Sequence, residues 1–378
     1  MKNDRTLGLY LHIPFCLQKC LYCDFCSYPG QDDAAMNAYA DALVTELGAG
    51  AAAAGDRWVT SVFFGGGTPT LLPVAVMARL CDTIRRFYRV RPGAEWTLEG
   101  NPATFDARRA AALRACGFNR ISIGVQSACD SELQALGRVH TAADGIHALR
   151  AARAGGFSDI NADIMFGIPG ETADSFAATL DAVLAEGVEH LSVYSLQIEE
   201  GTPFFAARAH LSLPDEDTEE EMYAALCRRT RAAGYRHYEI SNFARPGHEC
   251  RHNLRYWRRG DYHGFGVAAH SLFGDVRFFN RADFPAYLGA PLSVREEEAR
   301  VGAAEAEYEA VMLSLRLAEG INDRAFAARF GHSFRAQYGA RLLPFRRAGL
   351  LEYAGAQTRL TERGMRLSNA VLAEILAD

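Results

Sequence analysis

The sequence lacks an excess of basic residues, a long apolar run and an apolar leader. A net charge of −6 over 378 residues is not the basic balance of a general nucleic-acid-binding protein, so we expect no nucleic-acid partner. No apolar stretch approaches the roughly 20 residues that cross a bilayer, and residues 1–6 lack the apolar core of a secretory signal. These absences predict a cytoplasmic globular protein.

Cysteine is scarce as well. Nine cysteines are too few for a disulfide scaffold in a chain of this length. Four of them, Cys16, Cys20, Cys23 and Cys26, crowd into one short run, while the others are scattered. Clustered thiols in a chain of cytosolic character indicate metal or redox chemistry.

Short β-rich runs alternate with helical periodicity from residue 8 to about residue 240. The predicted strands are 8–13, 59–64, 96–99, 120–125, 160–165, 191–197 and 236–240. The predicted helices are 35–47, 74–88, 107–115, 143–154, 173–185 and 218–233. This alternation is typical of a parallel sheet, and six or seven units are too few for an eight-fold barrel. We therefore expect an α/β fold built on a partial parallel (β/α)6 TIM-like barrel.

The sequence changes character after residue 245, where aromatic residues, glycine, histidine and arginine replace the regular alternation. Helical patterning returns at about residue 303 and ends in a short hairpin pattern and a closing helix. We expect a barrel over 1–240, a connecting segment over 241–290 and a winged-helix-like α+β module over 291–378.

Polar residues lie at or just beyond the predicted strand ends, at positions 65–68, Glu99, Gln126, Asp163 and Gln197. Ligands of parallel α/β folds bind at this edge of the sheet. The repetition at strand after strand predicts one binding site there.

The spacing of Cys16, Cys20 and Cys23 allows two metal sites. Three thiolates on one loop can hold three irons of a [4Fe–4S] cube and leave the fourth iron open to a small molecule. Alternatively, Cys26 could complete a closed zinc site of four cysteines. The triplet follows the first predicted strand, which is where a barrel site would lie.

The flanking residues favour the cube. Tyr10-Leu-His-Ile-Pro-Phe before Cys16, and Tyr22 before Cys23, resemble the radical S-adenosylmethionine superfamily. The resemblance implies that Cys16, Cys20 and Cys23 bind the cluster and that S-adenosylmethionine chelates the open iron. It also implies a reductive cleavage of that cofactor, which yields a 5′-deoxyadenosyl radical.

Other segments resemble the same family. Phe-Phe-Gly-Gly-Gly-Thr-Pro-Thr at 63–70 could be a mere tight turn, and it lacks the Gly-Lys-Ser/Thr ending of a P-loop. After the cysteine loop it resembles the glycine-rich segment that meets the methionine end of the cofactor, through Gly66, Gly67 and Thr68. Residues that match pocket segments of the porphyrin branch are Glu99, Gln126, Arg138 and Asp163, and the turn at 167–171 would abut the adenine.

A histidine segment indicates a haem or a related tetrapyrrole. His-Asn-Leu-Arg-Tyr-Trp at 252–257 places an imidazole beside aromatic rings and arginines. An imidazole can ligate iron, and arginine can meet propionates. The segment resembles the histidine motif of haem chaperones of the HemW type, which implies haem binding at His252. His270 is a second candidate.

The resemblance as a whole is to oxygen-independent coproporphyrinogen III dehydrogenases and their haem-chaperone relatives. Only nine residues precede Tyr10, and Phe25 stands where the dehydrogenases place a further cysteine; both features favour the chaperones. We therefore expect a protein that binds haem and delivers it to acceptor haemoproteins, with an electron donor such as a flavodoxin or ferredoxin. The alternative is a radical enzyme that decarboxylates porphyrinogen propionates to vinyl groups. Cys26 is expected not to be a ligand, and a homodimer and a peripheral membrane contact stay open.

Overall fold

The computed structural model describes residues 6–377, apart from the side chain of residue 298. One large sheet organises most of the chain, with the strand order β14-β13-β12-β11-β1-β4-β5-β6-β7-β8-β10-β9. Its centre is a run of parallel strands in chain order: β1 (Thr6–Ile13), β4 (Trp58–Gly66), β5 (Arg89–Gly100), β6 (Arg120–Gln126), β7 (Ile160–Phe166) and β8 (His190–Ser195). These six strands confirm the predicted parallel α/β fold.

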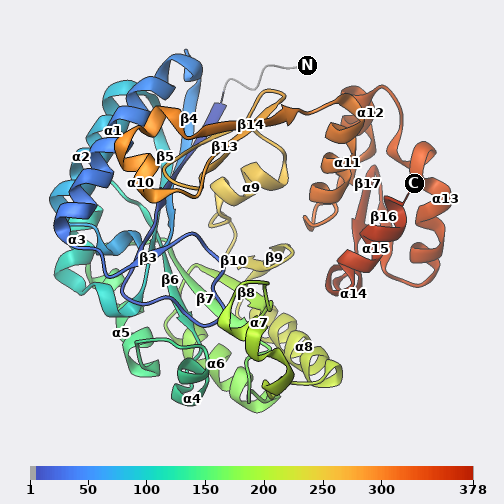
Figure 1. Ribbon diagram of the computed structural model, residues 1–378. Helices are drawn as coiled ribbons and strands as arrows, with labels where there is room; N and C mark the ends of the chain where they lie inside the picture. Colours follow the sequence, from blue (N-terminus) through green and yellow to red (C-terminus); the bar gives the residue numbers. More distant parts are fainter. Residues whose placement is uncertain (1–5, 378) are drawn as a thin grey trace.

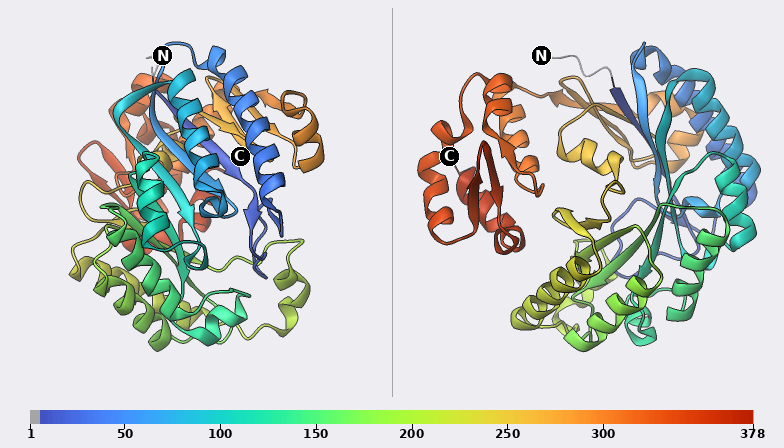
Figure 2. Two further views of the ribbon diagram at one scale, coloured as in Figure 1. Left: turned by 90° about the vertical axis from the view of Figure 1, so that its left-hand side faces the viewer. Right: turned by 180° about the vertical axis from the view of Figure 1, so that it is seen from behind.

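Helices that connect these strands cover the outer face of the curved sheet (Figures 1 and 2). They are α1 (Asp33–Ala54), α2 (Val74–Phe87), α3 (Ala107–Ala115), α5 (Ala142–Ala154) and α6 (Ala173–Ala185), with α8 (Glu216–Ala232) after the last parallel strand. Shorter pieces in the loops are α4 (Asp130–Ala135), α7 (Pro203–Ala207) and 3-10 turns at Pro69–Leu71, Pro102–Thr104, Arg208–His210 and Pro291–Ser293.

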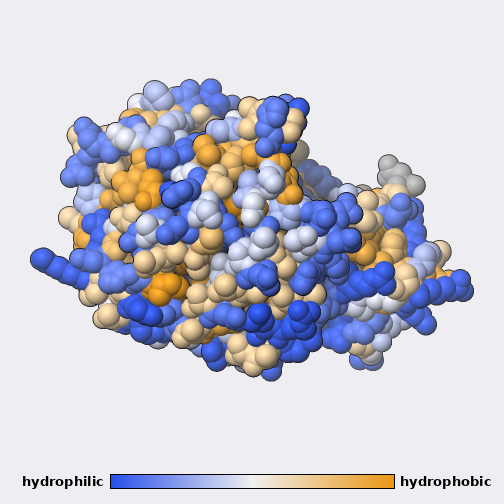
Figure 3. All heavy atoms as spheres, turned by 90° about the horizontal axis from the view of Figure 1, so that it is seen from below, coloured by the Kyte–Doolittle hydropathy of each residue, from blue (hydrophilic) through white to orange (hydrophobic). Residues whose placement is uncertain are grey.

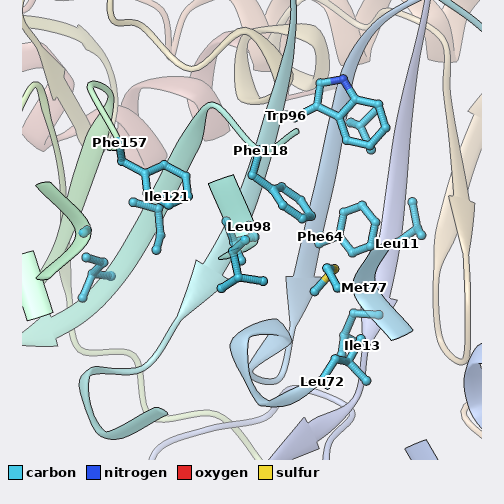
Figure 4. Packing of buried hydrophobic residues seen from close by; sticks show 14 of the residues in the cluster. Leu11, Ile13, Phe64, Leu72, Met77, Trp96, Leu98, Phe118, Ile121 and Phe157 are labelled. Atoms are coloured by element: carbon cyan, nitrogen blue, oxygen red, sulfur yellow. The ribbon is translucent and has the colours of Figure 1, made fainter. Parts of the chain in front are cut away.

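The core lies between the sheet and this outer layer (Figure 4). Strand residues that alternate inward, such as Leu11, Phe64 and Leu98, are fully buried. Phe64 meets Phe118 edge to face, with 5.0 Å between ring centroids. This packing fixes the strands and therefore the positions of the residues at their ends.

Antiparallel strands extend both edges of the parallel sheet. On one side β8 pairs with β10 (Asn242–Ala244), which pairs with β9 (Arg236–Glu239). On the other side β11 (Tyr262–Phe265) runs parallel to β1 and is followed by β12 (His270–Phe273), β13 (Val276–Asn280) and β14 (Arg295–Arg300). The last predicted strand, at 236–240, is therefore an antiparallel edge strand rather than a further barrel unit.

The segment without a clear sequence period contributes two short helices. Helix α10 (Phe284–Gly289) packs against α1, and α9 (Arg251–Trp257) lies on the inner, concave side of the sheet (Figure 1). The N-terminus of α9 is held by Glu95 of β5, whose carboxylate accepts hydrogen bonds from the backbone N–H groups of Arg251 (2.8 Å) and His252 (2.9 Å). Helix α9 is thereby fixed inside the barrel.

The C-terminal unit has its own core, formed by residues that include Val311, Leu315, Phe334, Leu342 and Ile375. It contains α11 (Ala303–Ser314), β15 (Ile321–Asn322), α12 (Asp323–Phe330), α13 (Phe334–Arg347), the hairpin β16 (Leu351–Ala354) and β17 (Gln357–Leu360), α14 (Glu362–Arg366) and α15 (Ser368–Ile375). Three helices followed by a hairpin give a winged-helix-like arrangement. The unit faces the open side of the barrel, with α11 next to α9 (Figures 1 and 2).

The part of the chain between residues 6 and 377 contains no helix long and apolar enough to cross a membrane. Seen from below, the surface is mostly hydrophilic, and its hydrophobic patches are separated by polar residues (Figure 3).

Candidate functional site

A cavity of about 390 Å³ opens at the carboxyl ends of the parallel strands. We call it the cysteine cavity, because the loop after β1 forms one of its walls. Most of the residues predicted from the sequence line it: Cys16, Cys20, Tyr22, Cys23, Gly66, Gly67, Thr68, Glu99, Gln126, Arg138 and Asp163. The structure thus brings together side chains from β4, β5, β6 and β7 that lie far apart in the sequence.

The cysteine loop is closed at its base by β2 (Phe15–Cys16) and β3 (Tyr28–Pro29), which pair in parallel. Burial raises the pKa of the Cys16 and Cys23 thiols above its ordinary value. Two neighbours donate hydrogen bonds to the sulfurs, Thr68 Oγ1 to Cys16 at 3.7 Å and Arg138 Nη1 to Cys20 at 3.5 Å. Donors at the sulfurs favour the thiolate form that a metal centre requires.

Cys26 is separated from the other three thiols. Its Sγ lies 3.6 Å from the Tyr28 hydroxyl, and its side chain lines a neighbouring cavity rather than the cysteine cavity. In residues 6–377, no group of three or more cysteine, histidine or acidic side chains converges on the position of a single metal ion. The Cys26 thiol thus faces a different cavity from the thiols of Cys16, Cys20 and Cys23.

The glycines after β4 are needed for packing within the protein itself. A Cβ atom on Gly67 would lie 2.6 Å from the carbonyl oxygen of Phe15 and 2.9 Å from that of Ile13. The close approach allows the Gly67 N–H to donate to Ile13 O (2.9 Å) and the Thr68 N–H to donate to Phe15 O (2.7 Å). The end of β4 is thus clamped to the start of the cysteine loop.

Two half-buried carboxyl groups give one side of the cavity an acidic character. Glu99 accepts a hydrogen bond from the Gly66 N–H at 3.0 Å; burial, together with the charge of Asp163, raises its pKa to about 8. Burial also raises the pKa of Asp163, which accepts hydrogen bonds from Ser122 and Asn161. A bound cation would favour the ionised form of both groups.

Arg138 supplies a positive charge on another wall. Its Nη2 donates to Gly124 O at 2.8 Å, while its buried Nε has no hydrogen-bond partner within residues 6–377. Gln126 beside it has a positive φ of 66° and accepts a hydrogen bond from the Tyr194 hydroxyl at 3.2 Å. A buried donor without a partner and two carboxyl groups in one cavity fit a ligand that carries both a carboxylate and cationic groups, as S-adenosylmethionine does.

His252 and Tyr10 lie outside the cysteine cavity. His252 is fully buried, with Nδ1 2.9 Å from Ser61 Oγ and Nε2 2.8 Å from the Tyr256 hydroxyl, and its ring stacks on Phe63. Burial lowers its pKa to about 3. Neither nitrogen is available to iron in this arrangement, in contrast to the expected axial ligand.

His252 instead lines a polar cavity of about 240 Å³ inside the barrel, which shares Glu99 and Asp163 with the cysteine cavity. Asn253, on the same helix, lines both of these cavities and was not predicted as a site residue from the sequence. The hydroxyl of Tyr10 lies 2.9 Å from His12 Nδ1.

A larger cavity of about 530 Å³ lies between the barrel and α11, and we call it the apolar cavity. It shares Phe25, Gly66 and Glu99 with the cysteine cavity, so the two adjoin. Its other lining residues are Tyr10, His12, Cys26, Tyr256, Arg259, Tyr262, Ala268, His270, Leu272, Arg277, Glu309, Met312 and Leu313. The aromatic and arginine content around 251–262 was a partial signal for this cavity, but no sequence feature indicated the contribution of α11.

The fold and the cysteine cavity define a radical S-adenosylmethionine protein. The family model described as the radical SAM superfamily matches residues 10–183, and the HemN C-terminal domain matches residues 303–367. Membership of this superfamily implies a [4Fe–4S] cluster and S-adenosylmethionine.

Relatives over the whole length narrow the assignment. The chain is 38% identical over 380 residues to the haem chaperone HemW of Mycobacterium tuberculosis, covering 98% of this chain and 95% of that protein. It is 35% identical over 378 residues to HemW of Bacillus subtilis, covering 98% and 99%. The chain therefore belongs to the HemW family of radical SAM proteins. Among solved structures, the radical SAM enzyme coproporphyrinogen III oxidase (HemN) from Escherichia coli matches with a TM-score of 0.87 at 25% identity, covering 99% of this chain and 91% of that one.

Proposed function

We propose that this protein is a haem chaperone that binds haem together with a [4Fe–4S] cluster and S-adenosylmethionine, and that it delivers the haem to acceptor haemoproteins in the cytoplasm. The observation that carries the proposal is the apolar cavity, which adjoins the cysteine cavity and offers room and aromatic walls for a flat macrocycle. The names of the full-length relatives support the same function.

In this proposal Cys16, Cys20 and Cys23 hold the cluster. When bound, the cluster and S-adenosylmethionine supply one-electron reductive chemistry, with electrons from a flavodoxin- or ferredoxin-like donor. Arg138 binds the carboxylate of the cofactor, and the carboxyl groups of Glu99 and Asp163 face its cationic part. Phe25, Gly66 and Glu99 line both cavities and so lie between the cofactor and the haem in this proposal.

The haem is placed in the apolar cavity, with Tyr256 and Tyr262 among its aromatic walls. His270 lines this cavity, whereas both nitrogens of His252 are engaged elsewhere. Because His270, the second candidate from the sequence, lines the proposed haem site and His252 does not, His270 is the proposed iron ligand. The division into residues 1–240, 241–290 and 291–378 stays a proposal, as do a homodimer and a peripheral membrane contact.

The likeness to HemN favours a second candidate function, the oxidative decarboxylation of coproporphyrinogen III. An anaerobic assay with reductant and S-adenosylmethionine distinguishes the two. Stoichiometric vinyl product with 5′-deoxyadenosine would overturn the chaperone proposal.

The cluster ligands are tested by anaerobic reconstitution with iron and sulfide. We expect a brown wild-type protein, and loss of cluster absorbance in C16S, C20S and C23S. C26S should keep the cluster, because the Cys26 thiol faces the apolar cavity. C129S is the matched control, since Cys129 is a half-buried free cysteine outside both cavities. A colourless wild type that holds one zinc ion, with the zinc lost in C26S, would refute the assignment.

Haem binding is tested by titration of the wild type and of H252A and H270A, followed by the Soret band. A changed Soret band in H270A and an unchanged one in H252A are expected. A changed band in H252A alone would return the ligand role to His252.

A further inference from the structure

The apolar cavity is lined by a buried arginine, Arg259, one of whose N–H groups lacks a hydrogen-bond acceptor within residues 6–377. The Arg259 side chain is 6% exposed and lines this cavity. Its Nε donates to Glu309 of α11 at 2.5 Å, but its Nη2 is buried without a hydrogen-bond partner among residues 6–377. A buried guanidinium N–H without an acceptor is costly, so this donor indicates a ligand group that is present in the loaded state.

Arg259 shares its acidic partner with a second arginine. Arg259 and Arg277 both contact the Glu309 carboxylate, so that one acidic group serves two guanidinium groups inside the cavity. An incoming carboxylate would give the Nη2 group of Arg259 the acceptor that it lacks among residues 6–377.

The backbone holds Arg259 in place at the end of the helix that carries the histidine motif. Arg259 follows α9 with a positive φ of 53°, and its N–H donates to Tyr256 O at 3.0 Å. This left-handed conformation favours glycine, and an arginine there directs its side chain to the cavity at a conformational cost. The same helix end thus supplies one aromatic wall, Tyr256, and one cation.

We infer that Arg259 is the recognition residue for a ligand carboxylate in the apolar cavity, which in the proposed function is a propionate of haem. The inference rests on that function and adds the orientation of the bound molecule. One propionate meets Nη2 of Arg259 beside α11, and the apolar part of the macrocycle points toward the aromatic walls. Glu309 of α11 bonds the same guanidinium, so the ligand carboxylate binds where the C-terminal unit contacts the barrel.

The test compares ferric haem with its dimethyl ester, which has the same macrocycle but no propionate charge. Wild type should bind haem at least about tenfold more tightly than the ester, because a charge-assisted hydrogen bond in a buried site is lost. R259Q should bind the two molecules with similar affinity. R258Q is the matched control: the neighbouring Arg258 is 55% exposed, pairs with Glu319 and lines neither cavity, so its preference for haem should stay as in wild type.

R259G provides a second variant, since glycine suits the left-handed backbone and the fold is kept. It should lose the preference as R259Q does, with an unchanged far-ultraviolet circular dichroism spectrum. If R259Q and R259G keep the preference, or if wild type binds haem and ester alike, the role of Arg259 is refuted while haem binding stands. If wild type binds neither molecule, the proposed function itself fails.

Discussion

Removing the carboxylate of Glu95 should weaken the attachment of α9 to the barrel and lower the free energy of unfolding. Glu95 is 4% exposed and accepts hydrogen bonds from the backbone N–H groups of Arg251 and His252 at 2.8 and 2.9 Å. Helix α9 has no capping hydrogen bond from the side chain of its own N-cap residue, Cys250. A single side chain from β5 therefore satisfies two of the N-terminal donors that a helix leaves open.

The magnitude follows from these two bonds. A hydrogen bond to a charged group contributes about 1.5–3 kcal/mol, and E95A removes two of them from a buried position. Partial hydration of the freed N–H groups reduces the loss, so we expect about 3–5 kcal/mol lower free energy of unfolding for E95A. E95Q keeps an acceptor oxygen without the charge and should lose about half as much.

Urea denaturation of the variants measures this effect. D106A is the matched control, because Asp106 caps α3 through one bond to the Arg109 N–H (2.7 Å) at an exposed position. Loss of such a cap costs about 1 kcal/mol. If E95A is no less stable than D106A, α9 is held by its side-chain packing and the reasoning is refuted. Haem titration of folded E95A should show weaker binding, since Tyr256 and Arg259 lie at the other end of this helix.

Two further tests address the packing at Gly67 and the buried carboxyl group of Glu46. G67A should lower the free energy of unfolding by about 1–3 kcal/mol, because its Cβ meets backbone atoms that cannot move aside. G339A, in α13 with open space around the new Cβ, should instead gain about 0.5–1 kcal/mol; equal effects would contradict the clamp between β4 and the cysteine loop. Burial raises the pKa of Glu46 to about 7 against hydrogen bonds from Tyr287, Asn280 and the Gly266 N–H. Because the folded-state pKa lies above the unfolded value of 4.5, its contribution is fully present below pH 4.5 and is lost as the pH rises through 7. Between pH 4.5 and 8 wild type should lose about 3 kcal/mol that E46Q does not lose, and parallel pH profiles of the two proteins would refute this.

The barrel was predictable because its units repeat. The helices Ala107–Ala115 and Ala173–Ala185 match the predicted bounds, since each begins after a polar capping residue whose side chain accepts a backbone N–H bond. The residues of the cysteine cavity were predictable for a related reason. Parallel strands end at one edge, so polar residues that follow different strands meet there.

The region after residue 245 was not predictable in the same way. Its elements are short, with seven residues in α9 and four in β11, and show no period. The environment of His252 depends on Ser61, 191 positions earlier, and the apolar cavity depends on α11. A motif that places a histidine beside aromatic residues does not show which of its side chains faces the ligand. In this motif Asn253 lines the cysteine cavity and Tyr256 lines the apolar cavity, where the ligands are proposed to bind.

Strand β4 contacts both the cysteine loop and helix α9. Just beyond its carboxyl end, the N–H groups of Gly67 and Thr68 donate hydrogen bonds to the backbone of Ile13 and Phe15. In the middle of the strand, Ser61 is hydrogen-bonded to His252 of α9. A displacement of the cysteine loop would therefore act, through this strand, on the helix that borders the apolar cavity. Linkage then requires reciprocity: the factor by which the cluster and its cofactor change the affinity for cargo is the factor by which cargo changes the affinity for the cofactor. Loading and release of the two ligands form one thermodynamic cycle.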